Sequence, residues 1–542
     1  MKNVITALFF CMLFLNTSYA QENSWFYFRA KDTAFSPEFK RINDELVYQG
    51  NDIRLKKVLK EYKIYSFKKT YKGAKKENLR KTFFVIANKD ELLTDLLTVT
   101  SHLFEFGEII AEEDKKIFEP NDYGLTSTIG ENLGLQANLD YLDFLEAPKA
   151  WYYTTGSTDV LIGISDGRVD TTDLDFKGKT QMVHKSNLAK GHGYSISANA
   201  AAQGDNGHGI PGICYDCSIV GTNYGDFKNF KELLTLSEMG VKVINCSWIG
   251  LQYYETGQAA IDEMFENGTI IVAAAGNKGW DETKGKVFYY PASYNHVISV
   301  SSVMHKYNSV ADNILISEKG DPYASNIKNY LGRSIGFVDN DTLKSELIYP
   351  KGTAILNSQV DILAPTVGLI RYADFIFSGE ILYNLYETTS GATPFVSGTI
   401  GLMFSLVPCL PVEEVEAILK CSATNIDYIE ANKPFAGNYG AGSLNTGRAV
   451  VLLYKLYTPT ETAYIEKQRF SRWDFNLKAY SDKVVIRNQE FSEDATLNLV
   501  ARNSIVISEN TVLKPNTQGE IQLKIDTSLA VPCELRQRKN KN

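Results

Sequence analysis

DVLIGIS, residues 159–165, is a short run of apolar residues that ends at a carboxylate, Asp166. Four more runs of this kind follow: VKVINCSW at 241–248, TIIVAAAG at 269–276, HVISVSSV at 296–303 and QVDILAP at 359–365. Stretches with helical periodicity, such as 228–240 and 254–268, lie between them. Apolar strands that are separated by helices are typical of a parallel sheet buried on both faces. The sequence therefore predicts an α/β domain with a mostly parallel sheet over residues 142–457.

Different patterns flank this domain. Residues 21–118 mix strand-like and helical stretches, which predicts a small α+β module of alternating charge. Residues 119–141 are polar and contain a proline and glycines, which indicates an exposed linker. Beyond Thr458, runs such as KVVIRN and ATLNLVA alternate apolar and polar residues between turn signals. We expect residues 458–542 to form a small antiparallel β module.

Residues 1–20 have the form of a secretory signal peptide. Lys2 precedes an apolar core that is too short to span a bilayer, and the small residue Ala20 ends the segment. No later stretch approaches the length of a membrane span, so we expect a secreted or extracytoplasmic protein without a transmembrane segment after signal removal. The chain carries 56 basic and 64 acidic residues, and its net charge of −8 gives no support for nucleic-acid binding.

Five of the seven cysteines fall into three groups. Cys409 and Cys421 flank a helical pattern, and we expect a disulfide between them in an oxidising compartment. Cys214 and Cys217 form one CxxC pair without a second pair, so zinc is not expected, and a local disulfide and two free thiols both remain open. Cys246 lies inside an apolar run, which favours a buried free thiol.

Four polar residues lie at the ends of predicted elements. Asp166 and Asn277 each follow an apolar strand, His192 begins a run of small residues, and Ser390 precedes an apolar helix that has a proline near its start. Chemistry in parallel α/β sheets collects beyond the carboxyl ends of the strands. A carboxylate, an imidazole, a hydroxyl and an amide are the groups that acyl transfer requires. The chain order Asp, His, Ser is one of the known orders of this triad.

Three of these residues also have an ordinary structural interpretation. Ser390 has the residue type of a helix N-cap, and Asp166 and Asn277 have that of turn residues. His208, which also precedes a glycine, is a rival base. A glycine and a proline break any helix behind His208, whereas the residues behind His192 can form one, so we favour His192.

Six segments together resemble the motifs of the subtilisin-like serine proteases. ISDGRVDTTDLDF resembles the aspartate motif, HGYSISANAAAQGDNGHGIPGI the histidine motif, AAAGN the oxyanion-asparagine motif and TTSGATPFVSG the serine motif. VINCSW resembles the substrate-cleft strand, and YYPASYNHVISVSSV the segment after the asparagine. The resemblance implies a three-layer fold, with Asp166, His192, Ser390 and Asn277 as orienting acid, base, nucleophile and oxyanion donor.

Some positions depart from the family's pattern. Gly167 and Arg168 stand where threonine and glycine usually follow the aspartate. Tyr194 stands where threonine is usual, Thr388 where glycine is usual, and Gly391 where methionine is usual. None of these changes removes a reacting group. We therefore expect them to alter specificity more than activity.

The resemblance implies a secreted serine endopeptidase that acts on protein or peptide substrates through an acyl-enzyme. An esterase or transpeptidase with the same triad, and a secreted pseudoenzyme that serves as a binding module, are the alternatives. The chemistry requires no cofactor, and structural calcium is common in the family, although no acidic loop identifies its ligands. The module at 21–118 resembles the family's propeptides by position and size. This implies a propeptide that acts as intramolecular inhibitor and chaperone, with cleavage within residues 112–134.

Overall fold

The computed structural model describes residues 23–538, except 44, 72–75, 130–132, 185–190, 333, 335, 344–346, 349–353, 371 and 373–387. The predicted signal peptide lies outside the described residues. The chain divides into two compact units, residues 1–115 and 116–542, and each is taken by itself below. None of the helices in the described ranges has both the length and the apolar character needed to cross a membrane.

The first unit is an α+β module built on an antiparallel sheet with the strand order β4-β5-β1-β6. Alternate residues of β1, including Phe26 and Phe28, point into a core that α1 and α3 close with leucines such as Leu55 and Leu92. The elements are β1 (Ser24–Ala30), β2 (Phe39–Ile42), β3 (Glu45–Tyr48), α1 (Ile53–Lys60), β4 (Ile64–Lys69), α2 (Glu77–Arg80), β5 (Thr82–Ala87), α3 (Glu91–Val99) and β6 (Phe104–Ile109).

The second unit contains the parallel sheet that the apolar runs predict. Its strand order is β17-β12-β11-β10-β7-β9-β8, and every pairing within it is parallel. The strands are β7 (Leu161–Ser165), β8 (Thr180–Met182), β9 (Ser218–Thr222), β10 (Val243–Cys246), β11 (Ile270–Ala274), β12 (Val297–Val303) and β17 (Ile362–Pro365). Because the strands are parallel, their carboxyl ends share one edge of the sheet.

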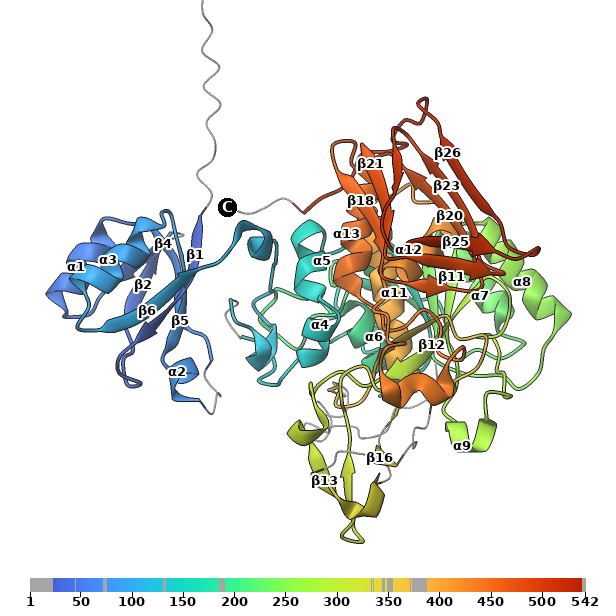
Figure 1. Cartoon of the computed structure of the whole chain (residues 1–542), viewed down its shortest axis with the longest axis horizontal. Coiled ribbons are helices and arrows are strands. Elements are labelled where there is room, and N and C mark those ends of the chain that lie inside the picture. The colour runs from blue at the N-terminus through green and yellow to red at the C-terminus, as the bar shows by residue number, and fades with distance from the viewer. Residues whose placement is uncertain are drawn as a thin grey trace, which may run out of the picture. The chain divides into compact units, whose positions relative to one another are not determined.

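Helices cover both faces of this sheet and give the predicted three layers (Figure 1). Successive residues of β10 show the division, since Val243 packs in the core that contains α11 and Ile244 packs in the core that contains α7 and α8. The helices are α4 (Asp140–Phe144), α5 (Ala147–Tyr153), α6 (His192–Ala201), α7 (Phe230–Glu238), α8 (Glu255–Glu266), α9 (Trp280–Thr283), α11 (Thr389–Leu406), α12 (Val412–Ser422) and α13 (Thr446–Tyr457). α11 is almost entirely buried, and it also packs against α6 and α13.

Between β12 and β17 the chain forms two small antiparallel pairs. β13 (Ile314–Ile316) pairs with β14 (Pro322–Ala324), and β15 (Gly336–Phe337) pairs with β16 (Leu347–Ile348). Val310, Ile327 and Phe337 contribute to a separate small core there.

The C-terminal strands are parallel, so the expectation of an antiparallel module is wrong. Three successive coils each contribute one strand to each of three sheets, which makes a parallel β-solenoid (Figure 1). Alternation along a strand shows which face is buried, but it does not show the direction of the neighbouring strand. The strands are β18 (Thr462–Glu466), β19 (Arg469–Phe470), β20 (Asp474–Ala479), β21 (Lys483–Arg487), β22 (Glu490–Glu493), β23 (Thr496–Ala501), β24 (Ile505–Ile507), β25 (Val512–Pro515) and β26 (Ile521–Ile525).

The solenoid packs on the α/β domain through a buried polar contact. Lys420 of α12 is nearly inaccessible, and its Nζ lies 2.9 Å from Asp361 Oδ1 and 4.1 Å from the centre of the Trp473 ring. Trp473 Nε1 donates to the same Asp361 oxygen at 3.1 Å. The lysine charge is therefore paired with a carboxylate and covered by an aromatic face.

The expected linker at 119–141 is mostly packed on the second unit, contrary to its polar composition. Asp122 and Tyr123 are fully buried, and the Asp122 carboxylate accepts hydrogen bonds from the backbone N–H groups of Asp205 and Asn206. The Phe118 N–H donates to Pro148 O at 2.9 Å. The polar Asp122 is buried because its carboxylate accepts hydrogen bonds from backbone N–H groups of the second unit. The exposed part of the predicted linker region is the short stretch before Phe118.

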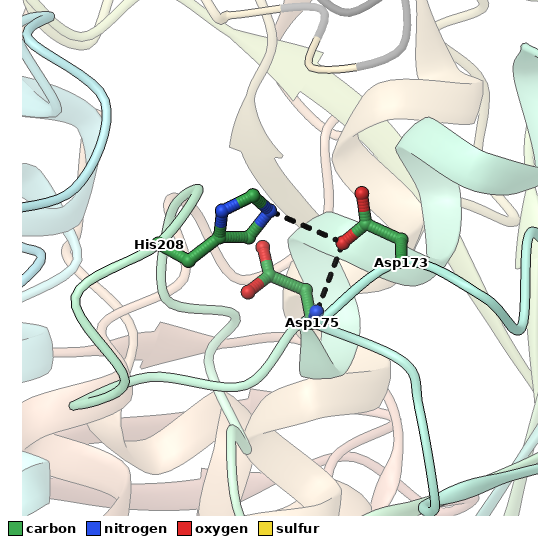
Figure 2. A group of neighbouring side chains, drawn as sticks. All are labelled: Asp173, Asp175 and His208. Atoms are coloured by element: carbon green, nitrogen blue, oxygen red, sulfur yellow. Dashed lines mark hydrogen bonds and ion pairs between the residues drawn. The ribbon is translucent and has the colours of Figure 1, made fainter.

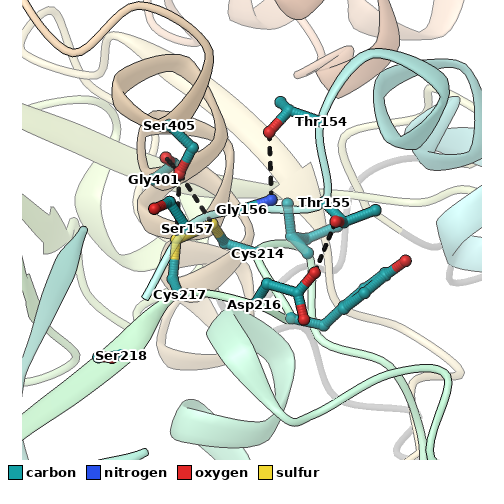
Figure 3. Close-up of a disulfide and its surroundings, with 12 residues drawn as sticks. Thr154, Thr155, Gly156, Ser157, Cys214, Asp216, Cys217, Ser218, Gly401 and Ser405 are labelled. Carbon is teal, nitrogen blue, oxygen red and sulfur yellow. Dashed lines mark hydrogen bonds between the residues drawn. A yellow bond between two sulfur atoms is a disulfide. The ribbon is translucent and has the colours of Figure 1, made fainter. Parts of the chain in front are cut away.

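The cysteine pairing differs from the expected one. Cys409 is bonded to Cys533 near the end of the chain, so the predicted Cys409–Cys421 bond is wrong. Cys421 lies on the buried side of α12 as a free thiol, and Cys246 is a buried free thiol as predicted. Cys214 and Cys217 form the local disulfide that the sequence left open, beside Gly401 and Ser405 of α11 (Figure 3).

Candidate active site

Asp166 follows β7 at the carboxyl edge of the sheet, and its side chain is fully buried. Its Oδ1 accepts a hydrogen bond from the Gly167 N–H at 2.5 Å. The structure gives this buried carboxylate a second partner, the ring of His192. Nδ1 of His192 lies 2.8 Å from Asp166 Oδ1 and 2.9 Å from Oδ2.

His192 is the first residue of α6, and the glycines on either side of it allow the backbone conformation and the close packing found there. Gly191 has a φ of 144°, in the region that favours glycine. A Cβ on Gly193 would lie 2.2 Å from Gly167 O, so only glycine lets the helix start approach the loop after β7. Because an ionised carboxylate only accepts hydrogen bonds, it selects the tautomer in which Nδ1 carries the proton. Nε2 is then left with a lone pair, on a side chain that is 43% exposed.

Ser390 lies in the first turn of α11, two residues after the helix cap at Thr388. Its Oγ donates to Ser247 O at 3.3 Å, and Ser247 Oγ donates back to Ser390 O at 3.0 Å. Ser247 follows β10, so these contacts hold the helix start against the carboxyl edge of the sheet. Ser390 and His192 both line one cavity of about 180 Å³.

Asn277 lies in the loop after β11 and is tied to the helix that carries Ser390. Its Oδ1 accepts from Thr389 N at 2.8 Å and from Thr389 Oγ1 at 3.0 Å, while Gly276 N donates to the same hydroxyl at 3.0 Å. With Oδ1 engaged in this way, the Nδ2 group of the amide is oriented away from Thr389. An amide donor is thus placed next to the residue that precedes Ser390.

The sequence analysis missed three residues that support this arrangement: Thr389, Ser247 and Tyr224. The only sequence signal for Thr389 is its place directly before Ser390. The signal for Ser247 is its place within the VINCSW segment. The Tyr224 ring lies 5.7 Å from the His192 ring. The pKa of the Tyr224 hydroxyl is raised, first by burial and then by the charge of Asp166 and a side-chain hydrogen bond to it.

His208, the rival base, lies in a different cluster. Its Nε2 is 3.5 Å from Asp173 Oδ1 and 3.2 Å from the Tyr372 hydroxyl. Asp173, Asp175 and His208 each offer one ligand atom, and these atoms lie within 4.8 Å of one another (Figure 2). Burial raises the pKa of Asp175 to about 7, so a bound cation would offset the cost of its charge. Among the described residues, this cluster is the one group of such side chains whose ligand atoms lie close enough together to hold a metal ion.

The α/β domain is similar in sequence to known proteins. A family model described as the subtilase family, Peptidase_S8, matches residues 157–442. The cell wall-associated protease of Bacillus subtilis (strain 168) is 27% identical over 286 residues, which is 50% of this chain and 26% of that protein. Subtilisin DY of Bacillus licheniformis is 23% identical over 297 residues, which is 53% of this chain and 91% of that protein.

Fervidolysin of Fervidobacterium pennivorans matches both in sequence and in structure. It is 23% identical over 308 residues, which is 51% of this chain and 38% of that protein. Its crystal structure matches with a TM-score of 0.42 and 16% identity, and covers 80% of this chain and 62% of that chain. The chain therefore spans well under half of the length of two of these curated relatives.

Proposed function

Because this chain belongs to the subtilase family, we propose that it is a serine endopeptidase that hydrolyses peptide bonds through an acyl-enzyme on Ser390. The observation that carries the proposal is the pair of contacts between His192 Nδ1 and the buried Asp166 carboxylate, with Ser390 on the wall of the same cavity as His192. A base held by a carboxylate beside a hydroxyl is the arrangement that nucleophilic catalysis requires.

In the proposed reaction, His192 Nε2 takes the proton of Ser390 as Oγ attacks the peptide carbonyl. Asp166 keeps the imidazole in the correct tautomer and stabilises the cation that forms. His192 then delivers the proton to the leaving amine, and water attacks the acyl-enzyme by the same route. In the described state Ser390 Oγ donates to Ser247 O, so it must rotate toward His192 when substrate binds.

The proposed oxyanion donors are Asn277 Nδ2 and a backbone N–H at the start of α11. Asn277 Oδ1 is held by Thr389, which fixes the amide without using Nδ2. Thr389 N donates to Asn277 Oδ1, and Gly391 N donates to Thr388 O. The backbone donor that we propose is therefore the N–H of Ser390 itself, in the first turn of α11. A donor fixed before the reaction stabilises the developing charge more than one that must reorganise.

Casein hydrolysis with and without a fluorophosphonate inhibitor tests this function. We expect the purified protein to degrade casein and to lose that activity once labelled. Labelling without casein or peptide hydrolysis would favour the esterase or transpeptidase alternative. Failure of both labelling and hydrolysis would favour a pseudoenzyme.

Replacing Asn277 by alanine is expected to lower kcat by about 10²–10³-fold with little change in KM, a magnitude known from a subtilisin's oxyanion asparagine. The interaction forms only in the transition state, so substrate binding is not affected. Steady-state kinetics on a peptide substrate measure the effect. Asn267→Ala, in an exposed turn after α8, is the matched control. An unchanged kcat in Asn277→Ala would make Asn277 a turn residue.

We further propose that the protein is exported and that its first unit is a propeptide. Secretion rests on the signal-like residues 1–20 and agrees with relatives such as the extracellular serine protease of Serratia marcescens. The propeptide role rests on position, size and the α+β fold of the unit. The first unit would assist folding of the second unit and inhibit its active site until cleavage between the two units releases it.

The expected mature form begins between Glu112 and Phe118. This stretch is mostly exposed, whereas the chain from Phe118 onward is held by the hydrogen bonds of the second unit. N-terminal sequencing of the secreted protein measures the cleavage site. Ser390→Ala expressed alone should remain uncleaved and be converted by active enzyme added in trans. An active secreted form that begins near Gln21 would mean that the first unit is permanent.

A structural divalent cation is proposed at Asp173 and Asp175. The two carboxylates suit calcium, and His208 adds a nitrogen that transition metals prefer. Calcium at a hundred times its Kd is expected to raise the free energy of unfolding by about 2.7 kcal/mol. Thermal unfolding after treatment with EDTA and then with Ca²⁺ or Zn²⁺ measures this stabilisation. Asp175→Asn should abolish the response and Glu263→Gln, on exposed α8 surface, should keep it; no response to either ion contradicts the site.

A further inference from the structure

The loop after β9 places Tyr224 beside the proposed triad. β7 and β9 are neighbouring parallel strands that pair Ser165 with Thr222. Asp166 and Tyr224 therefore follow the same edge of the sheet, one and two residues beyond these strand ends. The centre of the Tyr224 ring lies 5.7 Å from the centre of the His192 ring, and the two planes are inclined by 38°. Tyr224 thus lies next to the imidazole, on the edge from which the carboxylate projects.

Hydrogen bonds on both sides of Tyr224 fix the backbone of this loop. Ser165 Oγ donates to Asn223 O at 2.8 Å and accepts from Trp248 Nε1 at 3.1 Å. On the other side, the side-chain amide of Asn229 donates to Tyr224 O. The half-buried side chain of Tyr224 is therefore held at a defined place in the loop.

The buried Asp166 carboxylate takes its third donor from Tyr224. Its oxygens have about four acceptor positions, and Gly167 N and His192 Nδ1 supply two of the donors. Gly167 has no side chain that could supply another, and a buried charge that lacks partners is costly. The Tyr224 hydroxyl donates to Asp166, and its pKa is raised by burial and by that carboxylate, so the hydroxyl keeps the proton that it donates.

Other charged groups are scarce around this pair. α6, α11, β7 and β9 carry no lysine, arginine, aspartate or glutamate, and neither does the described lining of the cavity that contains His192. Arg168, in the loop after β7, is exposed. Tyr194 of α6 and Cys246 of β10 stay protonated at neutral pH, because burial raises the pKa of each. The carboxylate and the hydroxyl that donates to it are therefore the groups that set the proton affinity of the imidazole.

We infer that Tyr224 is a positioning residue of the proposed triad: its hydroxyl holds the Asp166 carboxylate and its ring packs beside the His192 imidazole, and together they set the pH at which His192 becomes a base. A donor draws negative charge away from the carboxylate, which then attracts the imidazolium less strongly. His192 therefore loses its proton at a lower pH than it would without the hydroxyl. The inference rests on the proposed function, because it requires His192 to act as the base.

The Tyr224→Phe variant tests this inference, because it removes the hydroxyl and keeps the ring. The pH dependence of kcat/KM on a peptide substrate reports the pKa of His192 in the free enzyme. We expect the acidic limb of this profile, where activity falls as His192 is protonated, to move up by about one pH unit, the size of effect that a hydrogen bond to a charged group has. On that limb kcat/KM should fall about tenfold at a given pH, with little change in KM. The rate of fluorophosphonate labelling should show the same shift, since it needs the same base.

A matched control removes a hydroxyl far in sequence from the triad. Tyr464→Phe alters a 36% exposed tyrosine of the solenoid and should keep the wild-type profile. Thermal unfolding should show that Tyr224→Phe is folded, because the backbone contacts of its loop remain. A wild-type profile in Tyr224→Phe, or a change confined to KM, overturns the inference while the endopeptidase remains. If wild type neither hydrolyses peptides nor takes the fluorophosphonate label, the proposed function itself is wrong.

Discussion

The Ser390→Ala variant is expected to lose casein hydrolysis by about 10⁶-fold, the loss that removal of the nucleophile causes in a subtilisin. The triad acts as a unit, so His192 and Asp166 have no substrate-directed role once the hydroxyl is gone. The fold should persist, because among the described residues Ser390 Oγ donates to Ser247 O alone, at the start of a helix that is otherwise buried.

Hydrolysis rates and thermal unfolding of Ser390→Ala, compared with Ser492→Ala in the solenoid, measure this prediction. Ser492 Oγ donates to Glu490 on the same strand, far in sequence from the catalytic elements, so its loss should leave hydrolysis intact. If Ser390→Ala still hydrolyses casein, the nucleophile is a residue other than Ser390. An unfolded Ser390→Ala would mean that the hydroxyl is structural.

The Asp166→Asn variant is expected to lower kcat by about 10⁴-fold at neutral pH. An amide in place of the carboxylate can donate to Nδ1, which leaves the proton on Nε2, the nitrogen that must accept it from Ser390. The backbone N–H of Gly167 can still donate to an amide oxygen, so local structure should survive. Steady-state kinetics on a peptide substrate, with KM determined separately, measure the loss.

Asp170→Asn is the matched control for Asp166→Asn, because it changes a carboxylate on the same loop that accepts from Thr172 rather than from His192. Little change in kcat is expected there. Equal losses in both variants would indicate a general disturbance of the loop. A normal kcat in Asp166→Asn would show that the buried carboxylate has no part in the chemistry.

The parallel sheet could be predicted from apolar strands that alternate with helices. The positions of Asp166, His192, Asn277 and Ser390 at element ends could also be predicted, and a site there was expected because parallel strands have a common carboxyl edge. The structure brings Asp166 into contact with His192 and ties Asn277 to the helix that carries Ser390. Their catalytic roles stay predictions. The bridging role of Thr389 could not be read from the sequence, because it depends on two loops meeting at one hydroxyl.

Other features depend on contacts between distant residues. Cys409 pairs with Cys533, and neither the spacing nor the flanking residues indicate a partner so far along the chain. Burial of Asp122 cannot be predicted from a polar segment, because it depends on the backbone donors of Asp205 and Asn206. The cavity that His192 and Ser390 line likewise exists only because α6 and α11 pack together.

Mass-spectrometric mapping of the fluorophosphonate adduct on the wild-type protein tests the central claim most directly. The account predicts a single adduct, on Ser390, that forms at neutral pH. No adduct should form when the protein is denatured before the label is added. An adduct on another serine, or a folded protein that takes no label while a known serine protease is labelled in parallel, would contradict it.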